Sequence, residues 1–399
     1  MLTSGVVPQF SSVEDVITSL SPDEPVHCVR PSHLHDAAGT FIAGFPGDTL
    51  YAVKCNANPY VLQHLFLAGI THFDVASDHE IKLISSRFPS ATMYYHHPAK
   101  TAQSIKNAYH RYSVRYFAVD CEGELEKVVA NTGPDAAITV RISVPQDNSV
   151  YDLSTKFGAP AVLARQLMSK AKNLNRDVGV TFHVGSQCLD PIAYKRAMLI
   201  AFQIASEAGV ILSHMDVGGG FPGYYQSTSA PDWSVYFDTI RATAKDLFKA
   251  TDTRLQCEPG RALVYGSSSL LTRVILRKEN TLYINDGIFG GLAEIYWGGE
   301  ALALKCRAYR DGRIHSGTSH KYVVYGPTCD GNDKLPYLVN LPVDLEDGDW
   351  IEFEQLGAYG REMATRYNGL RSEIMVSLGN ATESLSNPTQ ITDKADFHS

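Results

Sequence analysis

Between about residues 50 and 258, short apolar runs alternate regularly with longer stretches whose apolar residues recur at helical spacing. The short runs are rich in β-branched and aromatic residues, which favours strands, whereas the longer stretches are typical of amphipathic helices. The runs end at or near Lys54, Asp74, His96, Asp120, Arg141, His183, Gly218 and Glu258. Eight strands that alternate with helices predict an α/β fold, a TIM-like (β/α)8 barrel of roughly 250 residues. We assign residues 27–262 to this barrel.

The pattern changes after the barrel. Short β-rich runs follow one another, separated by turn signals such as Asn285-Asp-Gly287, and no long helix is expected before about residue 360. This pattern predicts a β domain over residues 263–380, joined by the N-terminal segment 1–26. Residues 381–399 are rich in Ser, Thr, Asn and Asp and are predicted to be a disordered tail. The strands predicted for the β domain include residues 262–264, 270–278, 281–284, 301–309, 321–325 and 350–355.

Polar residues stand at the ends of the predicted barrel strands. In (β/α)8 barrels the active site is built at the carboxyl ends of the strands, so these side chains are expected to meet at one mouth. Strands often end in polar loops, and that ordinary explanation accounts for any one of these residues. It does not account for a lysine, a histidine, a glycine triplet and a glutamate followed by Pro-Gly-Arg together.

Lys54 closes the apolar run Leu50–Val53. Burying an ammonium costs several kcal/mol unless something compensates, so a lysine here is unusual. One interpretation is a desolvated lysine with a lowered pKa that forms a Schiff base with a carbonyl cofactor. The alternative is a lysine that reaches solvent from the strand end.

The glycine triplet Gly218–Gly220 directly follows a predicted strand. Its backbone N–H groups can approach a phosphate closely, although a glycine triplet by itself is more often a structural turn. Arg261, three residues after Glu258, is suited to bidentate phosphate binding. His183 can stack on a planar ring, and Ser186 offers a hydroxyl. No companion residues with zinc spacing accompany His183, so no metal is predicted.

Composition restricts the class of protein. The chain is 44% hydrophobic and 20% charged, as in an ordinary globular protein, and its net charge of -8 argues against a nucleic-acid or anionic-membrane partner. No apolar run approaches the roughly 20 residues that span a bilayer, and the N-terminus lacks the pattern of a secretory signal. Seven cysteines without C-x-x-C spacing predict reduced thiols and a cytoplasmic location.

Several separate motifs along residues 51–367 support a more specific interpretation. They are Tyr51-Ala-Val-Lys-Cys-Asn56, Phe73-Asp-Val-Ala-Ser77 with Glu80, Lys156-Phe-Gly158, His183-Val-Gly-Ser-Gln187, Asp216-Val-Gly-Gly-Gly-Phe-Pro222, Glu258-Pro-Gly-Arg261, Asn285-Asp-Gly287, Gly326-Pro-Thr-Cys-Asp330 and Leu356-Gly-Ala-Tyr-Gly360. In this order they resemble the fold type III (alanine racemase-like) pyridoxal-phosphate decarboxylases, most closely the ornithine/lysine decarboxylase branch.

The resemblance implies roles for individual residues. Lys54 would hold pyridoxal 5'-phosphate (PLP), Glu258 would bind the pyridine nitrogen, and His183 would lie on the ring face. Asp74 and Glu80 match motif positions near the cofactor. The residues implied in phosphate or other cofactor contacts are Ser186, Gly218, Gly219, Gly220, Gly260, Arg261 and Tyr359.

The resemblance also implies a head-to-tail homodimer with shared active sites. Cys329 would donate a proton to the substrate carbon from across the interface, where Lys156 and Asp333 match an ion pair. Asp330 would receive the distal ammonium of a diamino acid. A second acid is expected after the Asn285-Asp-Gly287 turn; one aligned position holds Gly298, and Glu294 suits a shorter branch.

The implied activity is decarboxylation of a basic L-amino acid, with L-ornithine to putrescine and CO2 favoured, for polyamine supply or a specialised metabolite. L-lysine, diaminobutyrate or another specialised amino acid remain alternative substrates. A racemase would need two bases across the ring, which Cys329 and Asp330 do not favour. A non-catalytic regulatory homologue would tend to lose the cofactor-binding residues that this chain keeps.

Overall fold

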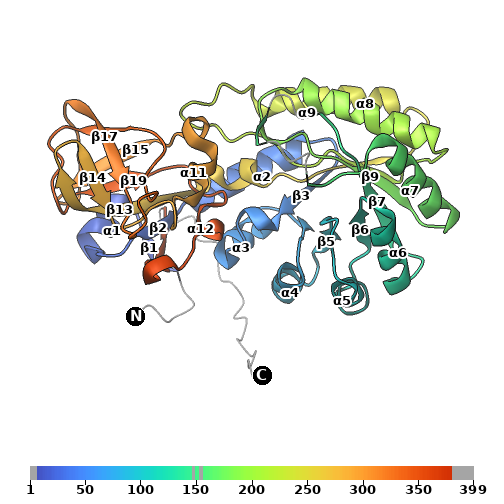
Figure 1. Cartoon of the computed structure of the whole chain (residues 1–399), viewed down its shortest axis with the longest axis horizontal. Coiled ribbons are helices and arrows are strands. Elements are labelled where there is room, and N and C mark those ends of the chain that lie inside the picture. The colour runs from blue at the N-terminus through green and yellow to red at the C-terminus, as the bar shows by residue number, and fades with distance from the viewer. Residues whose placement is uncertain (1–6, 146–148, 152–155, 380–399) are drawn as a thin grey trace.

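A computed structural model describes residues 7–145, 149–151 and 156–379. Eight parallel strands close into a barrel, and helices surround them (Figure 1). In barrel order the strands are β3 (Asp48–Ala52), β4 (His72–Asp74), β5 (Thr92–Tyr95), β6 (Tyr116–Val119), β7 (Ala137–Arg141), β9 (Val178–Thr181), β11 (His214–Asp216) and β12 (Arg254–Cys257), and β12 pairs back with β3. The predicted (β/α)8 fold is confirmed.

Capping residues fix where several barrel helices begin. The side chains of Ser77, Thr101 and Asp232 accept hydrogen bonds from backbone N–H groups in the first turns of α4, α5 and α9, which would otherwise lack partners. The helices are α2 (Pro31–Gly44), α3 (Pro59–Leu67), α4 (Asp78–Arg87), α5 (Ala102–Tyr112), α6 (Glu122–Asn131), α7 (Ala161–Asn173), α8 (Ile192–Glu207) and α9 (Trp233–Leu247).

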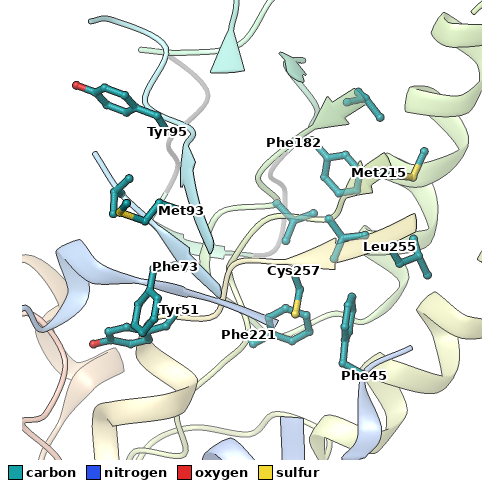
Figure 2. Close-up of a cluster of buried hydrophobic side chains, with 14 of the residues drawn as sticks. Phe45, Tyr51, Phe73, Met93, Tyr95, Phe182, Met215, Phe221, Leu255 and Cys257 are labelled. Atoms are coloured by element: carbon teal, nitrogen blue, oxygen red, sulfur yellow. The ribbon is translucent and has the colours of Figure 1, made fainter. Parts of the chain in front are cut away.

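A continuous apolar core joins the barrel strands to the helices. Figure 2 shows part of it, with aromatic side chains from several strands and the loops that follow them. Tyr51 and Phe73, on the adjacent strands β3 and β4, are both fully buried and meet edge to face at 6.5 Å between ring centres. Burying a side chain of this size stabilises a fold by roughly 1.5–3 kcal/mol. This core therefore fixes the strand ends that carry the polar residues.

The second part of the molecule is a sheet centred on β13 (Ser268–Lys278), which pairs with β2 (Val26–Val29), β14 and β19. Both ends of the chain contribute to it, because β2 also pairs in parallel with β20. Strand β2 thus belongs to the β domain, although residues 27–29 were assigned to the barrel. The remaining strands here are β1 (Gln9–Phe10), β14 (Thr281–Ile284), β15 (Cys306–Arg310), β16 (Arg313–His315), β17 (Ser319–Tyr325), β18 (Val339–Pro342), β19 (Trp350–Phe353) and β20 (Met375–Leu378), and the helices include α1 (Val13–Leu20) and α12 (Gly360–Met363).

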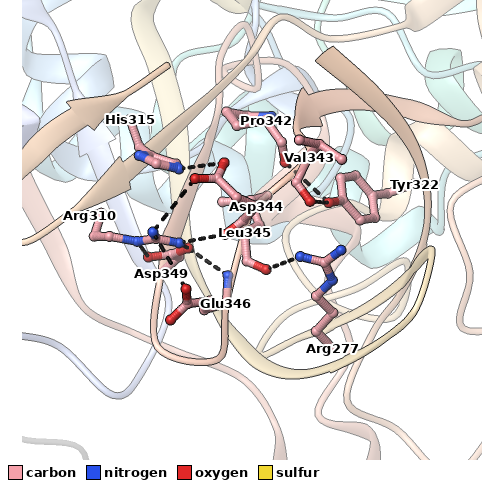
Figure 3. Close-up of polar contacts among 10 residues, drawn as sticks. All are labelled: Arg277, Arg310, His315, Tyr322, Pro342, Val343, Asp344, Leu345, Glu346 and Asp349. Carbon is pink, nitrogen blue, oxygen red and sulfur yellow. Dashed lines mark hydrogen bonds and ion pairs between the residues drawn. The ribbon is translucent and has the colours of Figure 1, made fainter. Parts of the chain in front are cut away.

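Polar contacts hold the loop before β19 against β15 and β16 (Figure 3). The guanidinium of Arg310 binds both carboxylate oxygens of the buried Asp349, at 2.9 and 2.7 Å. Its Nη2 also donates to the backbone oxygen of Asp344, whose side chain contacts His315 at 3.0 Å. Such a two-pronged contact is stronger and more directional than a single ion pair, so it fixes the β15–β16 hairpin against the loop before β19.

Several local predictions were wrong. Residues 262–264 belong to the short helix α10 (Arg261–Val264), and the run 301–309 begins with the 3-10 helix η3 (Gly299–Leu302) before β15. Helix α11 (Ala293–Gly298) and the antiparallel pair β8 (Ser149–Tyr151) with β10 (Ser186–Cys188) were not anticipated. The tail predicted for 381–399 lies outside the described residues.

All seven cysteines are free thiols. Across the described residues, no helix combines the length and the apolar character needed to cross a membrane.

Candidate active site

Lys54 lies in the mouth of the barrel, but not at the end of a strand as expected. Strand β3 ends at Ala52, and Val53–Cys55 forms a 3-10 turn, η1. The backbone N–H of Ala52 donates to Pro259 O at 3.2 Å, so the turn after β3 is tied to the loop that carries Glu258. Nζ of Lys54 lies 2.8 Å from Oδ2 of Asp74, at the end of β4.

The surroundings of Lys54 favour its charged form, contrary to the interpretation of a lysine with a lowered pKa. Its side chain is 47% exposed. Desolvation lowers the pKa of Lys54, but the carboxylates of Asp74 and Glu258 outweigh it and raise the pKa above that of an ordinary lysine. Asp74 was expected at this mouth, but its direct pairing with Lys54 across adjacent strands was not.

Glu258, directly after β12, has one carboxylate oxygen engaged and one available. Oε1 lies 2.7 Å from Nδ1 of His96, and the side chain is 10% exposed. Oε2 has no hydrogen-bond partner within the part of the chain that the structure describes. A carboxylate oxygen without a partner in a largely buried position suits a protonated ring nitrogen. Oε2 is thus suited to accept a hydrogen bond from the protonated pyridine nitrogen of PLP.

His183 follows β9 and is held in one orientation. Its Nδ1 accepts a hydrogen bond from the backbone N–H of Gly185 at 2.9 Å, which places the proton of the neutral ring on Nε2. Desolvation, followed by the nearby charges of Arg141 and Lys54, lowers the pKa of His183 to about 3. The imidazole is therefore neutral at physiological pH and suited to stack on a planar ring.

The glycine turn after β11 is required by packing as well as by any ligand. A Cβ at Gly218 would lie 2.0 Å from Phe182 O, and Gly218 and Gly220 have φ of 69° and 101°. The N–H of Gly218 donates to Oδ1 of Asp216 at 2.8 Å, so this amide is already engaged. Among the described residues no partner is found for the N–H groups of Gly219 and Gly220, which remain available to an anion.

Arg261 lies beside this turn and is 4% exposed. Its Nη1 donates to the hydroxyl of Tyr225 at 2.7 Å, and Nη2 lies 3.5 Å from Oγ of Ser186. The ring of Tyr359 lies 5.3 Å from the guanidinium carbon. Gly260 packs closely, because a Cβ there would lie 2.9 Å from Cβ of Cys55. Arg261, Ser186 and the two available amides can together hold a phosphate. Tyr225 was missed, since no motif marks it.

Glu294 contacts a different partner from the one expected. Helix α11 turns its carboxylate toward Nη2 of Arg261, and the two side chains form a buried ion pair. It was expected to receive the ammonium of a substrate. Its carboxylate instead pairs with Arg261, the residue suited to hold the phosphate.

Cys329 and Asp330 lie on a loop of the β domain, and among the described residues neither contacts Lys54. Cys329 is exposed, and its N–H donates to Oδ1 of Asn368 at 3.1 Å. Asp330 accepts from the N–H of Asn332 at 2.8 Å. Asp333 does not face outward as an interfacial residue should: it is 1% exposed and accepts hydrogen bonds from Ile288 and Thr328.

Polar residues at the ends of β6 and β7 support a neighbouring turn. Oδ2 of Asp120 accepts from the N–H of Gly158 at 3.0 Å, and the guanidinium of Arg141 lies 5.2 Å from the ring of Phe157. Glu80 in α4 accepts from the N–H of Ala76 at 2.6 Å, which fixes the loop after Asp74.

Comparison with known proteins identifies related sequences. The profile of the family described as "Pyridoxal-dependent decarboxylase, pyridoxal binding domain" matches residues 32–265. Mouse ornithine decarboxylase is 34% identical over 351 residues, covering 80% of this chain and 73% of the relative. The lysine/ornithine decarboxylase of Selenomonas ruminantium is 35% identical over 329 residues, covering 80% of each. Antizyme inhibitor 2 of Xenopus laevis is 32% identical over 394 residues, covering 90% of this chain and 82% of the relative.

Solved structures share the architecture. The arginine decarboxylase of Paramecium bursaria Chlorella virus, bound to agmatine, superposes with a TM-score of 0.82 at 28% identity, covering 92% of this chain and 99% of that one. A mutant of SrLDC in complex with PLP gives a TM-score of 0.82 at 28% identity, covering 95% and 97%.

Proposed function

Because the chain belongs to the family of pyridoxal-dependent decarboxylases, we propose that it removes the α-carboxylate of a basic L-amino acid, and specifically converts L-ornithine to putrescine and CO2. The observation that carries this proposal is the meeting of Lys54 and Glu258 at the adjoining ends of β3 and β12, next to an anion-binding turn. A primary amine, a carboxylate for a ring nitrogen and a phosphate region in one mouth are the contacts that PLP needs.

Each residue of the proposed site has a separate role. PLP, held by these residues, would supply the electron sink that decarboxylation needs. Lys54 anchors the cofactor through Nζ, with Asp74 alongside to pair its charge. Glu258 offers Oε2 to the ring nitrogen, and neutral His183 covers the ring face. Arg261, Ser186 and Tyr359 hold the phosphate together with the N–H groups of Gly219 and Gly220.

Cys329 completes the reaction from a partner subunit. Its thiol delivers a proton from Sγ to the substrate carbon that has lost CO2, and the resulting thiolate takes a proton from solvent. The exposed position of Cys329, which makes no contact with Lys54 within the described part of its own chain, supports a head-to-tail homodimer with shared sites.

Asp330, next to Cys329 on the same loop, is the acid that we propose for the distal ammonium. The pairing of Glu294 with Arg261 leaves Asp330 as the main acid for substrate choice. L-ornithine is favoured by the ornithine decarboxylases among the relatives. L-lysine, diaminobutyrate or another specialised amino acid is the alternative. The relative named antizyme inhibitor keeps a second candidate open, a regulatory homologue without catalysis.

The test uses the full-length protein supplied with PLP. CO2 release is measured with L-ornithine, L-lysine, L-2,4-diaminobutyrate and L-arginine, and we expect L-ornithine to react fastest. Lys54→Ala should release no CO2 and lack the near-visible absorbance band that borohydride bleaches. Lys82→Ala is the matched control, because Lys82 is an exposed lysine on α4 paired only with Asp78.

Each outcome decides between the candidates. CO2 release from none of the four amino acids would remove the substrate proposal, and full turnover by Lys54→Ala would remove the mechanism. Loss of optical rotation without CO2 would indicate a racemase. Wild-type protein without a band that borohydride bleaches would favour the regulatory homologue.

A further inference from the structure

His96 is buried at the base of the site and touches two acids at once. It follows β5 and its side chain is 2% exposed. Its Nδ1 lies 2.7 Å from Oε1 of Glu258, after β12, and 3.2 Å from Oδ2 of Asp216, in β11. These contacts join the end of β5 to β11 and to the end of β12, which lie 120 and 162 residues further along the chain. Nε2 of His96 has no hydrogen-bond partner among the described residues.

The cluster around His96 contains three carboxylates and few cations. Ligand atoms of Asp74, His96 and Glu258 all lie within 4.8 Å of one another, and Asp216 adds the third acid. Lys54 supplies one positive charge through Asp74. Buried like charges repel strongly, so three carboxylates with one ammonium would be unfavourable. A positive charge on His96 offsets one of the two negative charges that Lys54 leaves unbalanced.

The other groups packed against His96 do not supply that charge. His214, in β11, bonds to Thr139 Oγ1 at 2.9 Å, and desolvation followed by the charge of His96 lowers the pKa of His214 to about 3. Thr181 donates to Oδ2 of Asp216 at 3.1 Å, and the ring of Tyr94 meets His96 edge to face. Desolvation disfavours charge on His96, but the hydrogen bonds that its ring donates to Asp216 and Glu258, with the charges of these two acids, outweigh it and raise the pKa of His96 to about 10.

We propose that His96 is a positioning residue for Glu258: as an imidazolium, it holds Oε1 and partly offsets the charge of the clustered acids, so that Oε2 is left for the ring nitrogen of the cofactor. The inference rests on the proposed role of Glu258. It concerns the proton on His96 and the orientation of one carboxylate, neither of which requires turnover to measure.

Hydrogen bonding and charge can be separated by substitution. His96→Gln keeps an N–H donor near Glu258 and removes the charge, whereas His96→Ala removes both. Without the imidazolium the cluster is one unit more negative, which favours protons on neighbouring groups. The pH midpoint of the absorbance change of bound PLP should therefore rise by about one unit in both variants. PLP affinity should fall about tenfold in His96→Ala and less in His96→Gln, because only the first loses the contact that orients Glu258.

The first measurement is made without PLP, so it does not depend on whether the variants bind the cofactor. The full chain without PLP is labelled with 15N-histidine, and imidazole spectra are recorded from pH 6 to 9. We expect one histidine to remain an imidazolium through pH 9, and its signal to be missing from His96→Gln. His214→Gln is the matched control: it removes a buried but neutral imidazole from the same barrel, so it should leave both that signal and the absorbance midpoint in place.

The result that overturns the inference is a His96 signal that titrates near the ordinary histidine pKa or stays neutral. An unchanged midpoint and PLP affinity in both His96 variants would overturn it as well. Failure of the proposed function gives a different pattern, because a protein that binds no PLP through Lys54 can still carry the imidazolium.

Discussion

Carboxylates at the barrel mouth differ in how their surroundings treat a negative charge. Asp74 has the ammonium of Lys54 at 2.8 Å. Glu80 lacks such a partner and accepts only the N–H of Ala76. Desolvation accordingly raises the pKa of Glu80 to about 7, against a weaker lowering by that hydrogen bond. Burial and the charge of Glu258 raise the pKa of Asp74 as well, and the ammonium of Lys54 offsets that rise only in part.

This raised pKa predicts a pH-dependent effect of Glu80→Gln on stability. Between pH 4.5 and 7 the folded wild type binds a proton that the unfolded chain has released, so its free energy of unfolding falls as pH rises. The glutamine side chain of the variant cannot ionise. The variant should therefore gain stability relative to wild type across this window and level off above pH 7, as measured by urea unfolding at several pH values.

A control with the opposite sign is available. A hydrogen bond from Lys170 lowers the pKa of the exposed Glu122, so Glu122→Gln should lose stability relative to wild type as pH rises through the acid range. A constant difference between Glu80→Gln and wild type at all pH values would contradict the argument.

The loops that end the barrel strands depend on close backbone contacts. Gly220 has φ of 101°, and a Cβ there would lie 2.5 Å from Gly185 O, in the loop after β9. We expect Gly220→Ala to lower the free energy of unfolding by about 1–3 kcal/mol, because the new methyl group meets backbone rather than a movable side chain. Urea unfolding without cofactor measures this loss.

Gly123, in the first turn of α6, is the matched control. Nothing lies within 4 Å of a Cβ placed there. Gly123→Ala should therefore lose no stability, since alanine is the better helix former. Equal stability of Gly220→Ala and wild type would show that the turn can relax at no cost.

Local sequence patterns were enough to find the elements that repeat. The predicted barrel strands agree with β4 to β7 and with β12 to within about a residue, because each apolar run stops at a polar residue or a glycine. The short helices α10 and α11 were missed for the converse reason: an apolar run of four to six residues fits a buried strand equally well. The pair β8–β10 joins segments too short to carry a periodic signal.

The candidate site was predictable where a residue's position in the barrel is enough. Lys54, Asp74 and Glu258 were expected at one mouth, and the structure has them there. Contacts between strands were not predictable. His96 was noted only as a strand-end residue, since its bonds to Asp216 and Glu258 depend on side-chain directions across the barrel. The pairing of Glu294 with Arg261 likewise depends on the turn of α11.

At the scale of the whole molecule, the two parts of the proposed active site lie on different domains. Lys54 and Glu258 belong to the barrel, whereas Cys329 is exposed on the β domain. If the site is shared across a homodimer, each site takes Lys54 from one subunit and Cys329 from the other. Lys54→Ala and Cys329→Ala then remove groups that opposite subunits contribute to a site. When equal amounts of the two variants exchange subunits at random, half of the dimers contain one subunit of each variant. Each such dimer has one intact site.

We therefore predict that putrescine formation, absent from each variant alone, returns to about a quarter of the wild-type rate after the two are mixed and allowed to exchange. Cys121→Ala, which changes another exposed cysteine, should be active without mixing. If native mass spectrometry detects mixed dimers and the mixture still forms no putrescine, the shared site is wrong.

The sheet that joins both ends of the chain imposes an order on biosynthesis. Strand β2 emerges from the ribosome early, but its neighbours β13 and β20 are made only after the whole barrel. At ordinary translation rates it waits on the order of tens of seconds for β13. The barrel, whose strands pair almost in chain order, can close during that interval. The synthesis of β13 and β20 is then the event that lets the last edge of the molecule assemble.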